Sequence, residues 1–195
     1  MSLSDISSRL SESIARESNL GNEQKAVLAY AVETVILSIL GTLLVITTSS
    51  FFHVLIPALI ATVFGGTLRR LSGGAHFNTP FKCLIFGAAI YTLIGILSEQ
   101  MIKFGLVRIE LLMPLVIFCL IIAGMLAPVE SLGKPIHSKN LKLKLKSMSI
   151  LFIMLVLIIL CIYKFSLVLK VSSVLGITFQ CITLLPVFNR RGEVM

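Results

Sequence analysis

Hydrophobic residues along this chain form long runs, and short segments between the runs hold nearly all of the charges. A membrane-spanning helix needs about 20 apolar residues to cross a hydrocarbon core about 30 Å thick. The pattern therefore predicts an all-α integral membrane protein with about six membrane segments. Five runs fit this length, some of them narrowly: residues 26–47, 81–98, 109–126, 148–163 and 168–188.

The sixth apolar run, residues 51–66, is shorter and contains Pro57. On length alone it fits either a tilted span or a re-entrant segment. The distribution of positive charge favours a span, because membrane proteins concentrate lysine and arginine in their cytoplasmic segments. A re-entrant segment would move the later loops to the other side of the membrane and remove the bias that is seen with six crossings.

With six crossings and a cytoplasmic N-terminus, 13 of the 17 lysine and arginine residues lie inside and four lie outside. Both chain ends are then cytoplasmic, and the protein is a multi-pass protein of the cell membrane. The inner residues are Arg9, Arg16, Lys25, Arg69, Arg70, Lys82, Lys134, Lys139, Lys142, Lys144, Lys146, Arg190 and Arg191, and the outer ones are Lys103, Arg108, Lys164 and Lys170.

These assignments divide the chain into a polar N-terminal segment (1–25), a membrane domain (26–188) that contains a cytoplasmic loop at 65–83, and a cytoplasmic tail (189–195). Apolar residues recur every four positions in the first segment, which predicts an amphipathic helix on the membrane surface. The segment lacks the charged start, apolar stretch and cleavage site of a signal peptide.

Composition agrees with this division. Apolar residues make up 56% of the chain and charged residues only 13%, whereas about a quarter of the residues in a soluble domain are charged. The net charge of +8 follows from the topology and requires no nucleic acid as a partner. The alternating LKLKLK segment (141–146) resembles a basic segment that meets anionic lipid head groups. Docking of an acidic peptide is the alternative for this segment.

Four cysteines occur, and none forms a CxxC pair. Cys119, Cys161 and Cys181 lie inside apolar runs, where a cysteine behaves as a small hydrophobic residue. Cys83 differs because it lies at a membrane boundary, seven residues after His76. A thiolate is the reactive form of cysteine, and a nearby histidine can accept the thiol proton. His76 and Cys83 are therefore a candidate base and nucleophile.

The spacing of this pair requires a bend, because seven residues along one helix span about 10 Å. Pro80 supplies the bend, since proline suits the first position of a helix. Asn78 or Thr79 can cap that helix, which places Cys83 in or just after its first turn, where the helix dipole favours a thiolate. Gly73 and Gly74 permit backbone angles that fold the chain back over it. The alternative is an ordinary polar loop at the interface.

Other polar residues fit less specific roles. Arg69 and Arg70 either anchor the topology or bind a substrate carboxylate or a developing oxyanion. Glu33 lies inside the first span, where a carboxylate is costly and is a functional candidate. It can orient a partner, bind peptide or hold helices together, and the sequence does not choose among these. We expect no metal and no cofactor, because His53 and His137 fall on other segments.

The segment Arg69-Arg70-Leu71-Ser72-Gly73-Gly74-Ala75-His76, followed by Cys83, resembles the signature of the accessory gene regulator B (AgrB) family. These proteins are membrane cysteine endopeptidases of bacterial quorum sensing. A later segment also resembles a second motif of the family: Ala127-Pro128-Val129-Glu130 with Lys134-Pro135. An aromatic residue is common in the family at the position of Ala75. This difference concerns the fit of the substrate more than the chemical reaction. The resemblance covers essentially the whole chain.

The resemblance implies that the protein removes the C-terminal tail of a short AgrD-like propeptide and promotes cyclisation of the remainder into an autoinducing peptide. It implies catalysis by His76 and Cys83, importance of Arg69 and Gly74, and a homodimer. The alternative is a small transporter or membrane scaffold in which the histidine and cysteine are incidental. A transporter places polar groups near the middle of several spans. In this chain Glu33 is nearly alone there.

Overall fold

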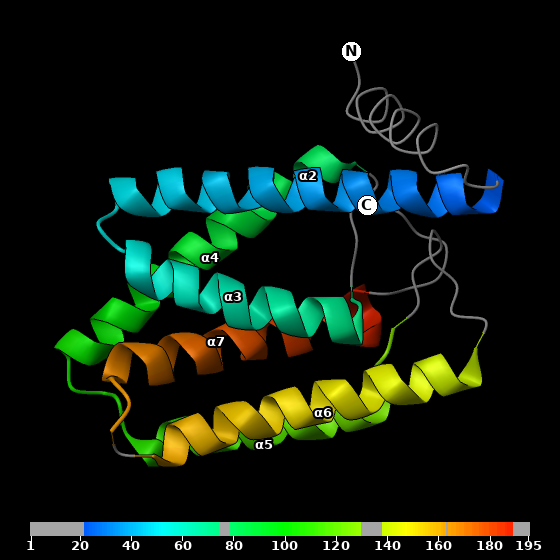
Figure 1. The fold of residues 1–195 in the computed structure, drawn as a ribbon. Helices are drawn as coiled ribbons and strands as arrows, with labels where there is room; N and C mark the ends of the chain where they lie inside the picture. Colours follow the sequence, from blue (N-terminus) through cyan, green and yellow to red (C-terminus); the bar gives the residue numbers. More distant parts are fainter. Residues whose placement is uncertain (1–21, 75–78, 130–137, 163, 189–195) are drawn as a thin grey trace.

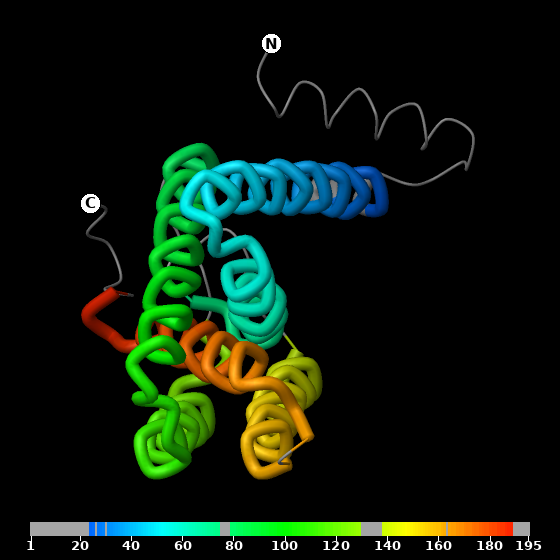
Figure 2. The backbone as a smooth tube through the Cα atoms, turned by 90° about the vertical axis from the view of Figure 1, so that its left-hand side faces the viewer, coloured from blue at the N-terminus to red at the C-terminus, as the bar shows by residue number. Residues whose placement is uncertain are grey.

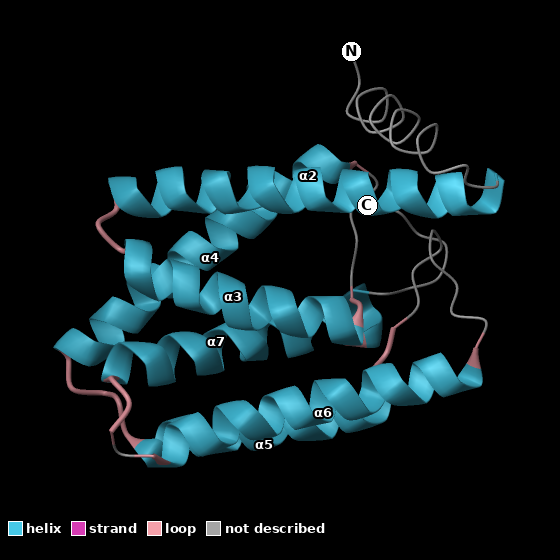
Figure 3. Cartoon of the chain, in the orientation of Figure 1, coloured by secondary structure: helices cyan, strands magenta, loops and turns pink. Residues whose placement is uncertain are grey.

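The computed structural model describes residues 22–74, 79–129, 138–162 and 164–188. Within these ranges the chain is helical and has no named strand, which confirms the all-α membrane class (Figure 3). The predicted surface helix falls mostly on residues outside these ranges. The described helices are α2 (Asn22–Phe51), α3 (Leu55–Ser72), α4 (Pro80–Lys103), α5 (Ile109–Leu126), α6 (Lys139–Cys161), α7 (Leu167–Thr183) and the short 3-10 helix η1 (Pro186–Phe188).

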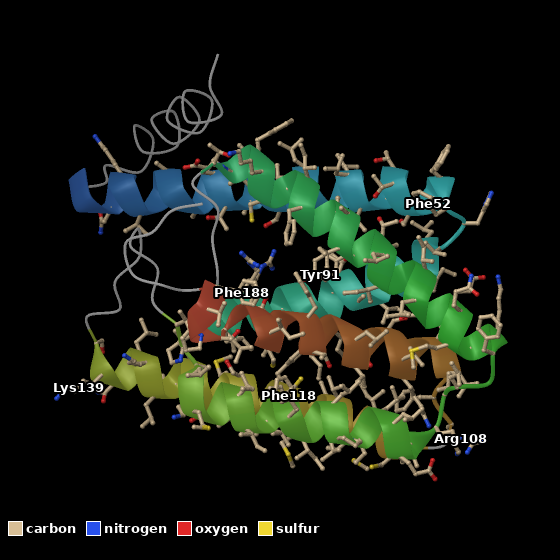
Figure 4. All side chains as sticks on the ribbon, turned by 180° about the vertical axis from the view of Figure 1, so that it is seen from behind. Phe52, Tyr91, Arg108, Phe118, Lys139 and Phe188 are labelled. Carbon is tan, nitrogen blue, oxygen red and sulfur yellow. The ribbon has the colours of Figure 1, made fainter. Side chains whose placement is uncertain are left out.

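The helices form a layered bundle (Figures 1 and 2). Helix α2 lies along one side, α3 and α7 occupy the middle, and α5 and α6 lie together on the opposite side. Helix α4 crosses obliquely and packs on α2, α3 and α7. Phe52 and Arg108 lie at one end of the bundle and Lys139 lies at the other (Figure 4).

Four helical segments in the described chain are long and apolar enough to cross a membrane. Helix α7 is a shorter apolar helix of 17 residues. Many large apolar side chains on the outside of the bundle are exposed, including Ile39, Leu93 and Leu151. In lipid such side chains need no protein partner, and a helix satisfies its own backbone hydrogen bonds. The four segments are Val27–Phe51, Pro80–Lys103, Ile109–Leu126 and Lys139–Cys161.

Two helices differ in extent from the apolar runs in the sequence. Helix α3 is continuous over 18 residues, a length of about 27 Å, with Pro57 in its first turn. Its crossing of the membrane stays a prediction. Helix α6 begins at Lys139 rather than at residue 148, because the lysine-rich segment is itself helical. Ser138 caps this helix by accepting a hydrogen bond of 3.4 Å from the Leu141 N–H.

Small residues let α3, α4 and α7 approach closely. A Cβ atom added to Gly176 would lie 2.5 Å from the Ala61 carbonyl oxygen, and one on Gly65 would lie 2.8 Å from the Gly176 carbonyl oxygen. On the α4 side, a Cβ on Gly95 would lie 3.0 Å from the Ala58 side chain. Close contact between helix backbones is the usual way in which small residues stabilise helix pairs in lipid. The α3–α7 contact is therefore the centre of the bundle.

Helix α2 is fixed to this centre through α4. The Thr48 and Thr92 hydroxyl groups form a hydrogen bond of 2.8 Å between the two helices. A Cβ on Gly41 would lie 3.0 Å from a terminal carbon of Leu84, so α2 also packs directly beside the start of α4. Cys83 is the neighbour of Leu84 in the chain, and α2 therefore runs past the candidate nucleophile.

A substitution tests the α3–α7 contact. Gly176→Ala would press a methyl group onto the backbone at Ala61, and we expect a loss of about 1–3 kcal/mol of stability. Thermal unfolding in detergent measures the effect. Gly66→Ala is the matched control, because no atom of the described residues lies within 4 Å of the added Cβ. Equal melting temperatures for the two variants would contradict this account.

The predicted topology is tested by labelling single engineered cysteines in a protein whose four native cysteines are replaced by serine, because the exposed Cys161 would otherwise react as well. Lys139→Cys and Lys164→Cys both replace exposed residues next to helix ends. We expect a membrane-impermeant maleimide to label residue 164 in intact cells, and residue 139 only after the membrane is opened, because the positive-inside rule places residue 139 inside. Labelling of residue 139 from outside would overturn the six-crossing topology.

Candidate active site

The paired glycines form a tight turn after α3. Gly73 has φ of 70° and Gly74 has φ of 139°, both in the region that favours glycine. The backbone freedom predicted for this pair is thus used by the fold. The Gly73 N–H donates a hydrogen bond of 3.0 Å to the Arg69 carbonyl, which ends the helix.

Two distant segments hold this turn. The Val129 N–H donates to the Ser72 carbonyl over 2.9 Å, and Gly73 and Val129 form an isolated parallel bridge. A Cβ on Gly73 would collide with the Val129 carbonyl oxygen. From the other side, Gln180 of α7 donates through Nε2 to the Gly73 carbonyl over 2.6 Å. The first motif of the sequence and the start of the second, Ala127–Val129, therefore meet in space.

Helix α4 begins as the proline predicts. Pro80 is its first residue, and Thr79 has the extended backbone of an N-cap. The Thr79 side chain makes no capping hydrogen bond, so this part of the prediction is wrong for Thr79; Asn78 lies outside the described residues. Cys83 is the fourth residue of the helix, and its N–H donates to the Thr79 carbonyl over 3.3 Å. The thiol is therefore at the end of the first turn, as expected.

Arg69 is brought to this thiol. Its Nη2 atom lies 3.8 Å from Cys83 Sγ, across 14 residues of sequence. Both side chains are partly buried at the end of α3 and the start of α4. A guanidinium group at this distance can donate a hydrogen bond to the sulfur atom and holds a positive charge beside it. The candidate nucleophile is therefore paired with a cation.

Arg70 points elsewhere. It is exposed, and its Nη2 atom donates a hydrogen bond of 3.2 Å to the hydroxyl group of Ser38 on α2. Glu33 is partly buried on α2, and no ion pair of its carboxylate is found within the described chain. His76 lies outside the described residues, and so do Glu130, Lys134 and Pro135 of the second motif. Of the described candidate residues, Arg69 and Cys83 are thus the two whose side chains meet.

The other histidine and cysteine positions are separate from this pair. His53 precedes α3, about 24 Å along that helix from Arg69, and lines a cavity of about 680 Å³ with Glu99. Cys119 and Cys181 are fully buried in the core, and Cys161 is exposed at the end of α6. In the parts of the chain that are described, no three histidine, cysteine or acidic residues gather as a metal site requires.

Two residues near the site were not singled out from the sequence. Gln180 is fully buried and bonds to the glycine turn, although it lies in an apolar run. A polar amide in an apolar run is costly, and this is the signal that could have identified it. Tyr91 is buried on α4, and a Cβ on Gly65 of α3 would lie 2.7 Å from its hydroxyl group. Figure 4 shows Tyr91 between these two helices.

The class of protein is thus an all-helical membrane bundle that carries an arginine–cysteine pair beside a double-glycine turn. The model of the family described as Accessory gene regulator B matches residues 7–184. The chain therefore belongs to the AgrB family, which confirms the resemblance and supports a role in processing the accessory gene regulator peptide of quorum sensing.

Two AgrB-like proteins of Clostridium perfringens are similar to this chain. One, from strain SM101, is 30% identical, and the other, from strain 13, is 28% identical. Each alignment covers 96% of this chain and 93% of the relative. No solved structure matches the chain.

The different surroundings of the two arginines lead to a test. We expect Arg69→Gln to slow alkylation of Cys83 by iodoacetamide at pH 7 by about tenfold, which corresponds to about 1.4 kcal/mol, because the thiolate loses its cation. Digestion and mass spectrometry follow Cys83 specifically. Arg70→Gln is the matched control, since Arg70 bonds to Ser38 instead. Equal rates in the two variants would contradict a contact that stabilises the thiolate.

Proposed function

We propose that this protein is a membrane-embedded cysteine endopeptidase. It cleaves the C-terminal tail from a short AgrD-like propeptide through a thioester on Cys83, and it promotes cyclisation of the remainder to an autoinducing peptide. The contact between the Arg69 guanidinium and the Cys83 thiol at 3.8 Å is the observation that carries the proposal. Membership of the AgrB family supports the substrate class. The proposal includes cytoplasmic chain ends and assembly as a homodimer.

The first chemical step forms the thioester. His76 accepts the Sγ proton of Cys83, and the thiolate attacks the carbonyl carbon of the scissile peptide bond. The C–N bond then breaks, and the leaving amine takes the proton back from His76. The tail departs, and the N-terminal fragment stays bonded to Cys83 Sγ. Arg69 stabilises the thiolate before the attack.

The second step closes the ring. A thiol or hydroxyl group within the bound fragment attacks the thioester carbon, and Cys83 leaves with a proton as the free thiol. Exchange of one thioester for another roughly conserves bond energy, so closure on a thiol needs no ATP. Hydrolysis competes with closure, and exclusion of water suppresses it. Cys83 is only partly exposed at a helix end, which supports such exclusion.

The start of α4 supplies donors for the developing oxyanion. The first N–H groups of a helix have no acceptor inside that helix, and the helix dipole favours negative charge near them. Pro80 has no N–H, and the Cys83 N–H is already bonded to Thr79. Phe81 and Lys82 follow Pro80 directly, and their N–H groups are the candidate donors.

Substitution of the two proposed catalytic residues is the direct test of function. Cys83→Ala and His76→Ala are expected to lower propeptide cleavage by at least about a hundredfold in reconstituted membranes, because one removes the nucleophile and the other its base. Cys161→Ser is the matched control, since that cysteine is exposed and distant in sequence. Normal cleavage by Cys83→Ala would end the cysteine-peptidase proposal.

A substrate that lacks its ring nucleophile separates the two steps. We expect the tail to leave and the remainder to accumulate on Cys83, because acylation and deacylation are separate reactions at one sulfur. Intact-protein mass spectrometry after rapid acid quench should detect the mass of the N-terminal fragment less water. Cys83→Ala should show no adduct. Steady release of linear product with no adduct at the earliest quench times would count against a thioester.

A further inference from the structure

Gln180 occupies an unusual position in α7. It is fully buried, and two of its polar contacts go to the end of another helix. Its Nε2 atom donates to the Gly73 carbonyl over 2.6 Å and to the Ser72 hydroxyl over 3.3 Å. Its Oε1 atom is buried and has no hydrogen-bond partner within the described chain. An apolar residue would avoid this unsatisfied acceptor, so the amide is not explained by packing alone.

The glycine turn is fitted closely around this amide. A Cβ on Gly74 would lie 3.0 Å from Gln180 Nε2 and 2.8 Å from the Thr183 hydroxyl oxygen. The Thr183 hydroxyl itself donates to the backbone carbonyl of Gln180 over 2.7 Å. On the opposite side the Val129 N–H holds the Ser72 carbonyl. The turn is therefore fixed between α7 and the segment that follows α5.

A continuous set of contacts runs from this turn to the thiol. The Gly73 N–H bonds to the Arg69 carbonyl, and the Arg69 guanidinium lies beside Cys83 Sγ. Displacement of Gly73 would therefore move the last turn of α3, and Arg69 lies on that turn. A misplacement of about 1 Å at a reacting group lowers a rate by about a hundredfold.

We infer that Gln180 is a positioning residue for the active site, which acts through the glycine turn on the Arg69–Cys83 pair. This inference rests on the proposed function for its kinetic consequence. Gln180 touches neither the thiol nor, in this role, the substrate. It holds the end of α3 so that Arg69 meets the sulfur.

The test compares Gln180→Met and Gln180→Leu with the unchanged protein in reconstituted membranes. Methionine and leucine fill similar volume without hydrogen bonds, so each variant removes the Nε2 donor. We expect each variant to lower kcat for propeptide cleavage by about ten- to a hundredfold and to change KM by less than about twofold. Ser172→Ala is the matched control, because Ser172 is another fully buried α7 residue whose hydroxyl oxygen has no partner in the described chain.

A double variant distinguishes positioning from general destabilisation. If Gln180 acts through Arg69, adding Gln180→Met to Arg69→Gln should slow alkylation of Cys83 by less than about twofold beyond Arg69→Gln alone, while Gln180→Met alone should slow it by about tenfold. Independent effects that multiply would overturn the inference. A kcat within twofold of that of the unchanged protein for both Gln180→Met and Gln180→Leu would also overturn the inference. So would failure of both of these Gln180 variants to accumulate in the membrane.

The two proposals fail in different ways. Alkylation of Cys83 needs no substrate, so it measures the effect of Gln180 even if no propeptide is cleaved. Absence of cleavage by the unchanged protein, with slower alkylation in Gln180→Met, would reject the proposed function and retain the positioning role. Cleavage through a Cys83 adduct, with no effect of Gln180→Met, would retain the function and reject the positioning role.

Discussion

The close approach of α3 and α7 is the contact on which the rest of this bundle depends. Ala61, Gly65 and Gly176 bring two helix backbones together, and no added methyl group fits at Gly176 without displacing one of them. Because the helices are this close, Gln180 reaches the end of α3 with a 2.6 Å hydrogen bond. The geometry of the candidate active site thus depends on packing in the middle of the bundle.

The site itself combines local and distant contributions. Helix α4 places Cys83 at the end of its first turn because Pro80 fixes where the helix begins. The last turn of α3 supplies the positive charge through Arg69. Val129 and Gln180 come from later parts of the chain and hold the turn between them. The contacts that hold this arrangement are made by buried and partly buried residues, and the exposed apolar side chains on the outside of the bundle make few of them.

The all-α membrane class could be predicted from the sequence because apolar length is a property of single segments. The start of α4 at Pro80 and the backbone freedom of Gly73 and Gly74 are also local, and the fold uses both. The extent of α6 was underestimated because lysines interrupt the apolar run without interrupting the helix. The roles of Arg69 and Gln180 were left open or missed, since each depends on a contact between helices that no spacing rule defines.

Several contacts at the centre and at the site join a glycine to a backbone atom. Gly176 meets the Ala61 carbonyl, and Gly73 meets the Val129 carbonyl. A carbonyl oxygen is the same whatever side chain its residue carries. A change of side chain at Val129 therefore calls for no compensating change at Gly73, and we expect such contacts to produce few correlated substitutions between relatives. Coevolution methods would find the bundle through its side-chain contacts and pass over the contacts that set its closest spacing.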